Sequence, residues 1–207
     1  TNQTDIGVVT DIPGISRYAI KVMGRAGHSG TTRMPDRQDA LVAASEVITT
    51  AQDTGIAIAE QDNKHFVATI GRIDVYPNGA ATVPGEVNMV LDLRASHEHS
   101  RDEFLRQLQT ECNQISKHRS CKIETQLISN ASVAVMDNDL RQRLSHAAKS
   151  LNLSYIDLSS GAGHDMVHLS RIAPAAMVFI PCKDGLSHCP EELATPEAIA
   201  KGSAVLA

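Results

Sequence analysis

The order of periodic segments between residues 17 and 128 restricts the fold more than any other feature of this sequence. Alternating apolar residues predict strands at 17–23, 66–75, 87–94 and 122–128, and helical spacing predicts helices at 39–51 and 100–115. The resulting order, β-α-β-β-α-β, is that of a ferredoxin-like sandwich, an antiparallel sheet with two helices on one face. We place this α+β domain at residues 15–130.

Local signals predict where these elements begin and end. Gly55 is expected to stop the first helix. Ser100, with Glu103 three residues later, forms a capping-box pattern and predicts the start of the second helix. Gly71 is expected to loosen the strand at 66–75.

The remaining segments predict a partial α/β domain at residues 131–207, with residues 1–14 as a connecting strand. Strands are expected at 6–12, 155–158 and 175–180, and helices at 139–151, 166–169 and after Thr195-Pro196. The continuous apolar run at 175–180 predicts a strand buried on both faces of a sheet. These elements are few for an independent core, so we expect them to lean on more sheet.

Composition excludes several classes of partner. The net charge of −5 and pI near 6.0 argue against a nucleic-acid-binding face, and the sequence has no apolar run long enough for a membrane span. The polar start, TNQTD, predicts no signal peptide, and the lack of an initiator Met suggests a fragment. The four cysteines form no C-x-x-C pair, so a zinc ribbon is not expected. An acidic chain with few cysteines predicts a cytoplasmic protein with free thiols.

A glycine-rich stretch from residue 24 to 41, GRAGHSGTTRMPDRQDAL, holds the first candidate functional residue, His28. Its small residues allow tight turns and a close approach to a bound group. The imidazole is therefore free to meet a substrate, although on local features a surface loop without a role is an equally good interpretation.

The candidate metal ligand is His188, in the stretch GLSHCPEE. It follows the apolar run at 175–180, and functional groups of α/β sheets gather at the carboxyl ends of strands. Glu191 or Glu192 could orient it, although a lone histidine is more often structural. Cys182 and Cys189 flank this loop and are interpreted as packing residues rather than metal or redox groups.

For several other polar residues, the sequence allows both a structural and a functional interpretation. Arg94 ends a strand and either pairs with Asp92 or solvent, or binds a carboxylate. Asp165, in SGAGHD, either faces a substrate or caps the following helix. His97 and His99 could bind a metal, but we favour a solvated turn.

Three stretches in order, GRAGHSGTTRM, SGAGHD and FIPCKDGLSHCPEE, resemble signatures of the metal-dependent amidohydrolases. That family includes N-carbamoyl-L-amino-acid hydrolases, allantoate amidohydrolases and β-ureidopropionases, and is related to aminoacylases and dimetal carboxypeptidases. The resemblance runs from about Ile6 to the C-terminus and covers only the family's lid domain and the last part of its catalytic domain.

The resemblance implies a role for each candidate. His188 becomes one ligand of a site for two divalent ions, Zn or Mn. Arg94 grips the carboxylate of a small-molecule substrate, and Gly163 and His164 lie against that substrate. His28 reaches the active site of the neighbouring subunit in a homodimer formed through the lid, where it steadies the oxyanion formed when metal-activated water attacks an amide or ureide carbon.

The resemblance also implies what this chain lacks. The family's other ligands and its general-base Glu lie upstream of Thr1, so we expect weak metal binding and no activity from the chain alone. The alternative is a non-catalytic dimerisation module. Ala81 and Ile15 stand where ureide-specific members carry an Asn and often a Gln, and Arg33 replaces a Pro. The lost amides count against allantoate or an N-carbamoyl amino acid as the substrate.

Overall fold

The computed structural model describes residues 4–62 and 65–207, and these divide into two compact units. One unit is Gly14–Ser132, and the other combines residues 4–13 with Val133–Ala207. Within the described residues, no helix is long and apolar enough to cross a membrane. The expected assignment of these segments to a connector, a lid and part of a catalytic domain stays a prediction.

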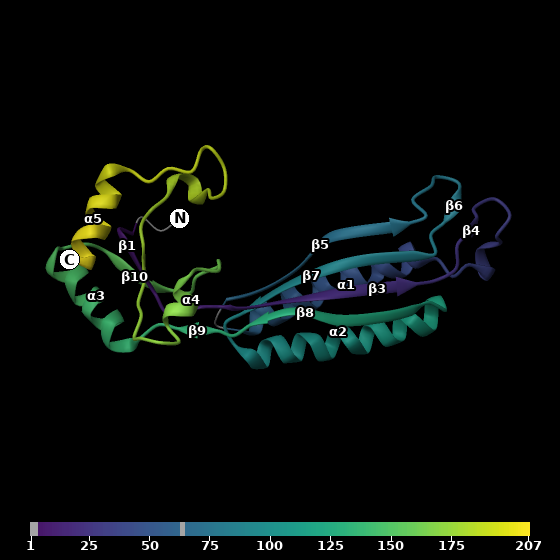
Figure 1. Ribbon diagram of the computed structural model, residues 1–207, viewed down its shortest axis with the longest axis horizontal. Coiled ribbons are helices and arrows are strands. Elements are labelled where there is room, and N and C mark those ends of the chain that lie inside the picture. Colours follow the sequence, from purple (N-terminus) through teal and green to yellow (C-terminus); the bar gives the residue numbers. More distant parts are fainter. Residues whose placement is uncertain (1–3, 63–64) are drawn as a thin grey trace. The chain divides into compact units, whose positions relative to one another are not determined.

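The unit Gly14–Ser132 is a four-stranded antiparallel sheet with two long helices (Figure 1). The strand order is β5-β7-β3-β8, which is the order of a ferredoxin-like sandwich. This part of the predicted fold is confirmed. The elements are β3 (Gly14–Met23), α1 (Ala40–Gln61), β5 (Phe66–Tyr76), β7 (Glu86–Ala95), α2 (Glu98–Arg119) and β8 (Lys122–Ala131).

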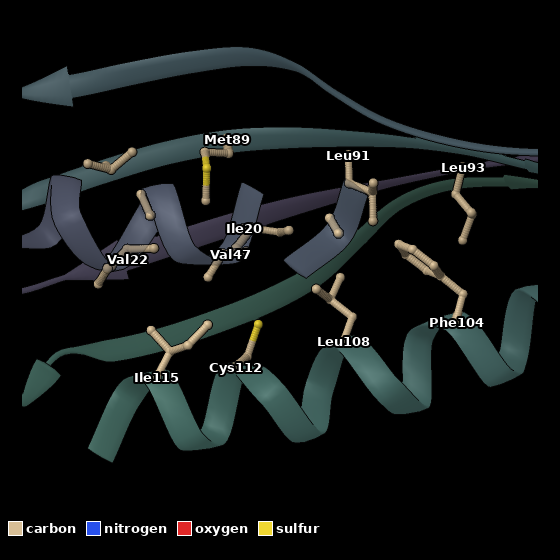
Figure 2. Packing of buried hydrophobic residues seen from close by; sticks show 14 of the residues in the cluster. Ile20, Val22, Val47, Met89, Leu91, Leu93, Phe104, Leu108, Cys112 and Ile115 are labelled. Carbon is tan, nitrogen blue, oxygen red and sulfur yellow. The ribbon is translucent and has the colours of Figure 1, made fainter. Parts of the chain in front are cut away.

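The core of this unit follows from the alternation in its central strand. Every second residue of β7 is buried, from Val87 to Ala95, while Asn88, Asp92 and Arg94 face the other side of the sheet. The helices close the buried face with side chains at helical spacing (Figure 2). Phe104 of α2 is fully buried and meets the ring of Phe66 at a centroid distance of 5.7 Å.

Helix α1 does not stop at Gly55, so that prediction is wrong. A Cβ at Gly55 would meet Ala68 at 3.5 Å and Phe104 at 4.0 Å, which places this glycine where the helix passes close to β5 and α2. Ile58, one turn later, is buried, and its burial stabilises the part of the helix that continues to Gln61. These are ordinary van der Waals distances, so Gly55 lies in a packed part of the helix and not at its end.

Helix α2 does not begin at Ser100, which corrects the capping-box prediction. Its N-cap is His97, and Ser100 lies inside the first turns. The Ser100 hydroxyl donates instead to the carboxylate of Asp62, the C-cap residue of α1. Glu103 accepts from Arg106 and Gln107, which follow it on the same helix.

The second unit is a mixed α/β assembly with two small cores, as expected for its class. Strand β1 is parallel to β10 and antiparallel to β11, and β2 pairs with β9. Its remaining elements are three helices and a short 3-10 turn. The bounds are β1 (Ile6–Val9), β2 (Asp11–Ile12), β9 (Ala134–Val135), α3 (Asn138–Ser150), β10 (Tyr155–Leu158), α4 (Met166–Leu169), β11 (Val178–Phe179), η2 (Lys183–Gly185) and α5 (Pro196–Leu206).

Two strand predictions in this unit need correction. The segment 6–12 is divided between two sheets rather than forming one strand. The apolar run at 175–180 forms only the two-residue strand β11, which lies at a sheet edge and is half-buried. A continuous apolar run is typical of a strand that is buried on both faces. As an edge strand, β11 has a neighbouring strand on one side, and its side chains stay half-buried.

An ion pair joins the start of β1 to α5. The Asp5 carboxylate accepts from Lys201 Nζ at 2.8 Å and from the Ser154 hydroxyl and backbone N–H at 2.7 and 2.9 Å. Lys201 first, and then Ser154, hold the pKa of the Asp5 carboxyl well below its usual range.

Candidate functional site

The His28 loop leaves the sheet after β3 and returns through a two-residue ladder. Strand β4 (Gly27–His28) pairs with β6 (Thr82–Val83), so His28 lies opposite Thr82. The Gly30 backbone N–H donates to His28 Nδ1 at 3.0 Å. Because Nδ1 accepts this hydrogen bond, neutral His28 carries its proton on Nε2. The exposed imidazole therefore presents an N–H donor to whatever approaches it.

Several hydrogen bonds fix this loop. Arg37 donates to the carbonyls of Ser29, at 2.6 Å, and Thr32, at 3.2 Å, and the Ser29 N–H donates to the Ala81 carbonyl at 2.9 Å. A short 3-10 turn, η1 (Met34–Asp36), leads back towards α1. A donor held on an ordered loop loses little freedom when it meets a ligand.

Gly24 explains why the motif begins with a glycine. A Cβ at this position would lie 2.0 Å from the backbone oxygen of Gln38, closer than side chains and backbone approach in proteins. Gly24 N donates to the Gly85 carbonyl and Arg25 N donates to Gln38, each at 2.8 Å. The glycine lets three chain segments meet at the base of the His28 loop.

Arg94 lies near the C-terminal end of β7, on the face of the sheet away from the helices. Its Nε donates to Asp92 Oδ1 at 2.8 Å, and Arg17 Nε donates to the other oxygen of Asp92 at 3.0 Å. Ile15 and Val67 are its neighbours on the adjoining strands. The expected pairing with Asp92 is thus present, on a side chain that is 30% exposed.

Strand β4, which carries His28, lies with β6 at one end of this unit (Figure 1), whereas Arg94 is the penultimate residue of β7. Arg94 lies eight positions after Glu86 in β7, which corresponds to about 27 Å of extended strand. Strand β6, with its partner β4, precedes Glu86. One small substrate cannot contact both side chains of the same copy, so the structure does not bring these two candidates together.

His164 is held by a serine that the sequence analysis did not identify. Ser160 is fully buried, and its Oγ lies 2.9 Å from His164 Nε2. The His164 ring also packs on Phe179, with ring centroids 5.6 Å apart. Asp165 stands at the N-cap of α4, but its side chain makes no capping hydrogen bond. The signal available in the sequence was the position of Ser160, four residues before His164 in the same motif.

His188 lies on an exposed loop after η2 and has a left-handed backbone with φ of 59°. Its backbone N–H donates to Glu192 Oε2 at 2.9 Å, so Glu192 orients the backbone rather than the ring. Cys182 Sγ donates to the Leu186 carbonyl at 3.1 Å, and all four cysteines are free.

The described residues do not by themselves make a two-metal site around His188. Among residues 4–62 and 65–207, the one group of three side chains with ligand atoms close together is Asp62, His97 and His99. This group belongs to the unit Gly14–Ser132 and does not include His188. The expectation that His97 and His99 lie in a solvated turn is correct in part. His97 lies in the bend before α2 and His99 is exposed, but His99 belongs to α2, and His97, its N-cap, contacts Asp62.

The chain that carries this ferredoxin-like unit and these loops matches a known family of hydrolases. It belongs to peptidase family M20/M25/M40, whose profile matches residues 4–207. The recognition of this family from the three sequence motifs is confirmed.

Curated relatives are identical to the chain at about a third of the aligned positions. A protein described as an uncharacterized hydrolase of Haemophilus influenzae is 37% identical over 97% of this chain and 48% of its own length. The N-carbamoyl-L-amino-acid amidohydrolase of Paenarthrobacter aurescens is 34% identical over 99% of this chain and 48% of its own. The ureidoglycolate hydrolase of Arabidopsis thaliana is 34% identical over 98% and 42%.

A solved structure of a similarly named enzyme resembles the chain in fold as well as in sequence. The hydantoinase/carbamoylase family amidase from Burkholderia multivorans superposes with a TM-score of 0.89 at 34% identity, over 99% of this chain and 49% of that one. The chain therefore spans about half the length of the proteins that it matches.

Proposed function

We propose that the whole protein is a metal-dependent amidohydrolase that cleaves a C–N amide or ureide bond of a small carboxylate substrate, of the N-carbamoyl or N-acyl amino acid type. The observation that carries the proposal is the His28 loop, in which the Gly30 N–H occupies Nδ1 and leaves Nε2–H as a donor. The names of the relatives support the choice of bond. The free cysteines support the cytoplasm as the site of action.

Each candidate then has a defined task. The Nε2–H of His28 donates to the oxyanion that develops as the carbonyl carbon becomes tetrahedral, a contribution of about 3–4 kcal/mol for one such donor. The planar guanidinium of Arg94 binds the substrate carboxylate. The Gly163 backbone and the His164 ring, braced by Ser160, contact the substrate from the second unit.

Divalent metal, Zn or Mn, supplies the acidified water in this class of enzyme when it is bound. The described residues offer His188 alone as a ligand of that kind of site, so we assign no step to the metal in this chain. By the same reasoning the family's metal site, of which this chain offers His188, is expected to bind these ions weakly here, and the chain alone is expected to be inactive.

The separation of His28 from Arg94 supports a site shared between two copies. If both side chains act on one substrate, they come from different subunits of a homodimer formed through the ferredoxin-like unit. Strand β8 is an edge of the sheet and is exposed along most of its length, with Leu127 and Ile128 51% and 56% exposed. An exposed edge strand with apolar side chains is suited to pairing with a second copy.

A chimaera tests the proposed activity. Residues 4–207 would replace the matching segment of the Paenarthrobacter relative, and the product would be assayed with N-carbamoyl and N-acyl amino acids, allantoate and ureidoglycolate. Turnover of any of these that is lost in the His28→Ala chimaera supports the proposal. A folded, dimeric chimaera without activity on all of them would instead favour the dimerisation module.

Mixed dimers test the shared site. His28→Ala chimaera mixed with His188→Ala chimaera should regain part of the activity, because one of the two sites in the mixed dimer keeps both residues. His146→Ala, an exposed histidine on α3, is the matched control and should be fully active alone. If subunits exchange and the mixture stays inactive, His28 serves its own subunit or none.

A further inference from the structure

A cluster of two imidazoles and one carboxylate lies between the helices of the ferredoxin-like unit. Asp62 is the C-cap residue of α1, His97 is the N-cap residue of α2, and His99 lies in the first turn of α2. One ligand atom from each side chain lies within 4.8 Å of the other two. The sequence places Asp62 35 residues before His97, so only the fold brings the three together.

The geometry within the cluster is well defined. The Asp62 side chain is 3% exposed, and its Oδ1 lies 2.9 Å from His97 Nδ1. The other carboxylate oxygen accepts from the Ser100 hydroxyl. The rings of His97 and His99 stack at a centroid distance of 5.0 Å with an interplanar angle of 23°.

A hydrogen-bonded helix cap accounts for only part of this arrangement. Asp62, His97 and Ser100 are sufficient to join the end of α1 to the start of α2. That network gives no reason for a second imidazole, His99, stacked on the first with a ring nitrogen near the same carboxylate. Two imidazole nitrogens and a carboxylate oxygen within 4.8 Å of one another form a ligand set that suits a transition-metal ion.

We propose that Asp62, His97 and His99 bind one divalent transition-metal ion, preferably zinc, at the junction of α1 and α2. The ligand set is two nitrogens and one oxygen, which suits Zn²⁺ and Co²⁺ and not Mg²⁺ or Ca²⁺, since the latter prefer oxygen ligands. Ser100 holds the carboxylate from behind, as outer hydrogen-bond partners do at metal sites. The site is independent of His188 and of the proposed hydrolysis.

The ion would act on the end of the unit that carries Arg94. Arg94 lies three residues before His97 in the chain. Helix α1 ends and helix α2 begins at this junction. A cation that binds the folded unit and not the unfolded chain stabilises the fold through mass action. We therefore assign it a structural role in fixing the junction next to the predicted carboxylate-binding arginine.

Metal titration of the intact 207-residue chain tests this site. Metal-free protein is titrated with Co²⁺, followed by visible absorption, and with Zn²⁺ in competition, followed by calorimetry. We expect one equivalent to bind, with Mg²⁺ giving no signal. An outer hydrogen-bond partner is worth about 10- to 100-fold in metal affinity, so Ser100→Ala should weaken binding by about that factor and His99→Ala should abolish it.

Two histidine variants serve as controls. His118→Ala removes an exposed histidine from the other end of the same helix and should bind Co²⁺ as the parent chain does. His188→Ala should also bind unchanged. His99 is exposed, so its removal should leave the far-ultraviolet circular dichroism intact. Binding that survives in folded His99→Ala, that disappears in His188→Ala, or that is absent from the parent chain would each overturn the proposal.

Discussion

Gly24→Ala, compared with Gly71→Ala, isolates the effect of packing at the base of the His28 loop. Both changes remove a glycine from the unit Gly14–Ser132, and both lower the entropy of the unfolded chain by the same amount. A Cβ at Gly71 meets nothing within 4 Å, whereas one at Gly24 would lie 2.0 Å from the Gln38 carbonyl oxygen. The difference between the two variants is therefore a property of the folded state.

The magnitude follows from the two hydrogen bonds at that point. To bring the new Cβ to an ordinary distance, the backbone must separate by about 1 Å, because contacts closer than about 3 Å are not tolerated. The bonds from Gly24 N to Gly85 and from Arg25 N to Gln38, each 2.8 Å, would then lengthen beyond useful geometry. At about 0.5–1.5 kcal/mol each, their loss makes Gly24→Ala about 1–3 kcal/mol less stable than Gly71→Ala.

Native-state amide hydrogen exchange provides the assay. The slowest amides of β7 report opening of this unit by itself, which avoids any assumption that both units unfold together. A difference of 1–3 kcal/mol corresponds to exchange about 5- to 150-fold faster in Gly24→Ala than in Gly71→Ala. If the β7 amides of the two variants exchange at rates within about twofold of each other, the steric argument from the close approach of Gly24 to Gln38 is refuted.

Three further outcomes are expected. In the chimaera, His28→Ala should lower kcat by about 10²- to 10³-fold with little change in KM, whereas Arg94→Ala should chiefly raise KM, because a carboxylate clamp holds ground and transition states alike; steady-state kinetics that show the reverse pattern would exchange the two roles. Phe104→Ala should cost about 3–5 kcal/mol in the free energy of unfolding, and exchange of the β7 amides no faster than in the parent chain would contradict its place in the core. The ion pair with Lys201 lowers the pKa of Asp5, so ionised Asp5 stabilises the fold above its unfolded pKa of about 4, and this stabilisation is lost as pH falls towards the folded pKa. In acid titrations followed by circular dichroism, the stability of Asp5→Asn should therefore depend less on pH below about pH 4 than that of the parent chain. Identical titration curves would refute this linkage.

The elements whose side chains alternate or repeat regularly were predictable from the sequence. In β7 every second residue is apolar because one face packs on α1 and α2, and the pattern is visible without knowing what covers it. The positions of helix ends were not predictable in the same way. Gly55 and Ser100 carry strong local signals, yet one packs between elements and the other bonds to a residue 38 positions away.

The candidate site shows the same division. His28, Arg94, His164 and His188 were identified by motif, while the hydrogen bond from Gly30 that fixes the His28 tautomer became visible only in the structure. Ser160 and Asp62 were missed altogether. Their significance depends on a contact with one particular ring nitrogen, and residue spacing does not encode that contact.

The sequence by itself determined the ferredoxin-like order, the family and the residues that carry its motifs, because local periodicity and long specific motifs are properties of neighbouring residues. Only the tertiary structure decided that His28 and Arg94 lie far apart in one unit, that α1 continues past Gly55, and that Asp62 meets His97 and His99. These facts depend on strand register and on the packing of segments distant in sequence, where burial and steric fit outweigh local preference.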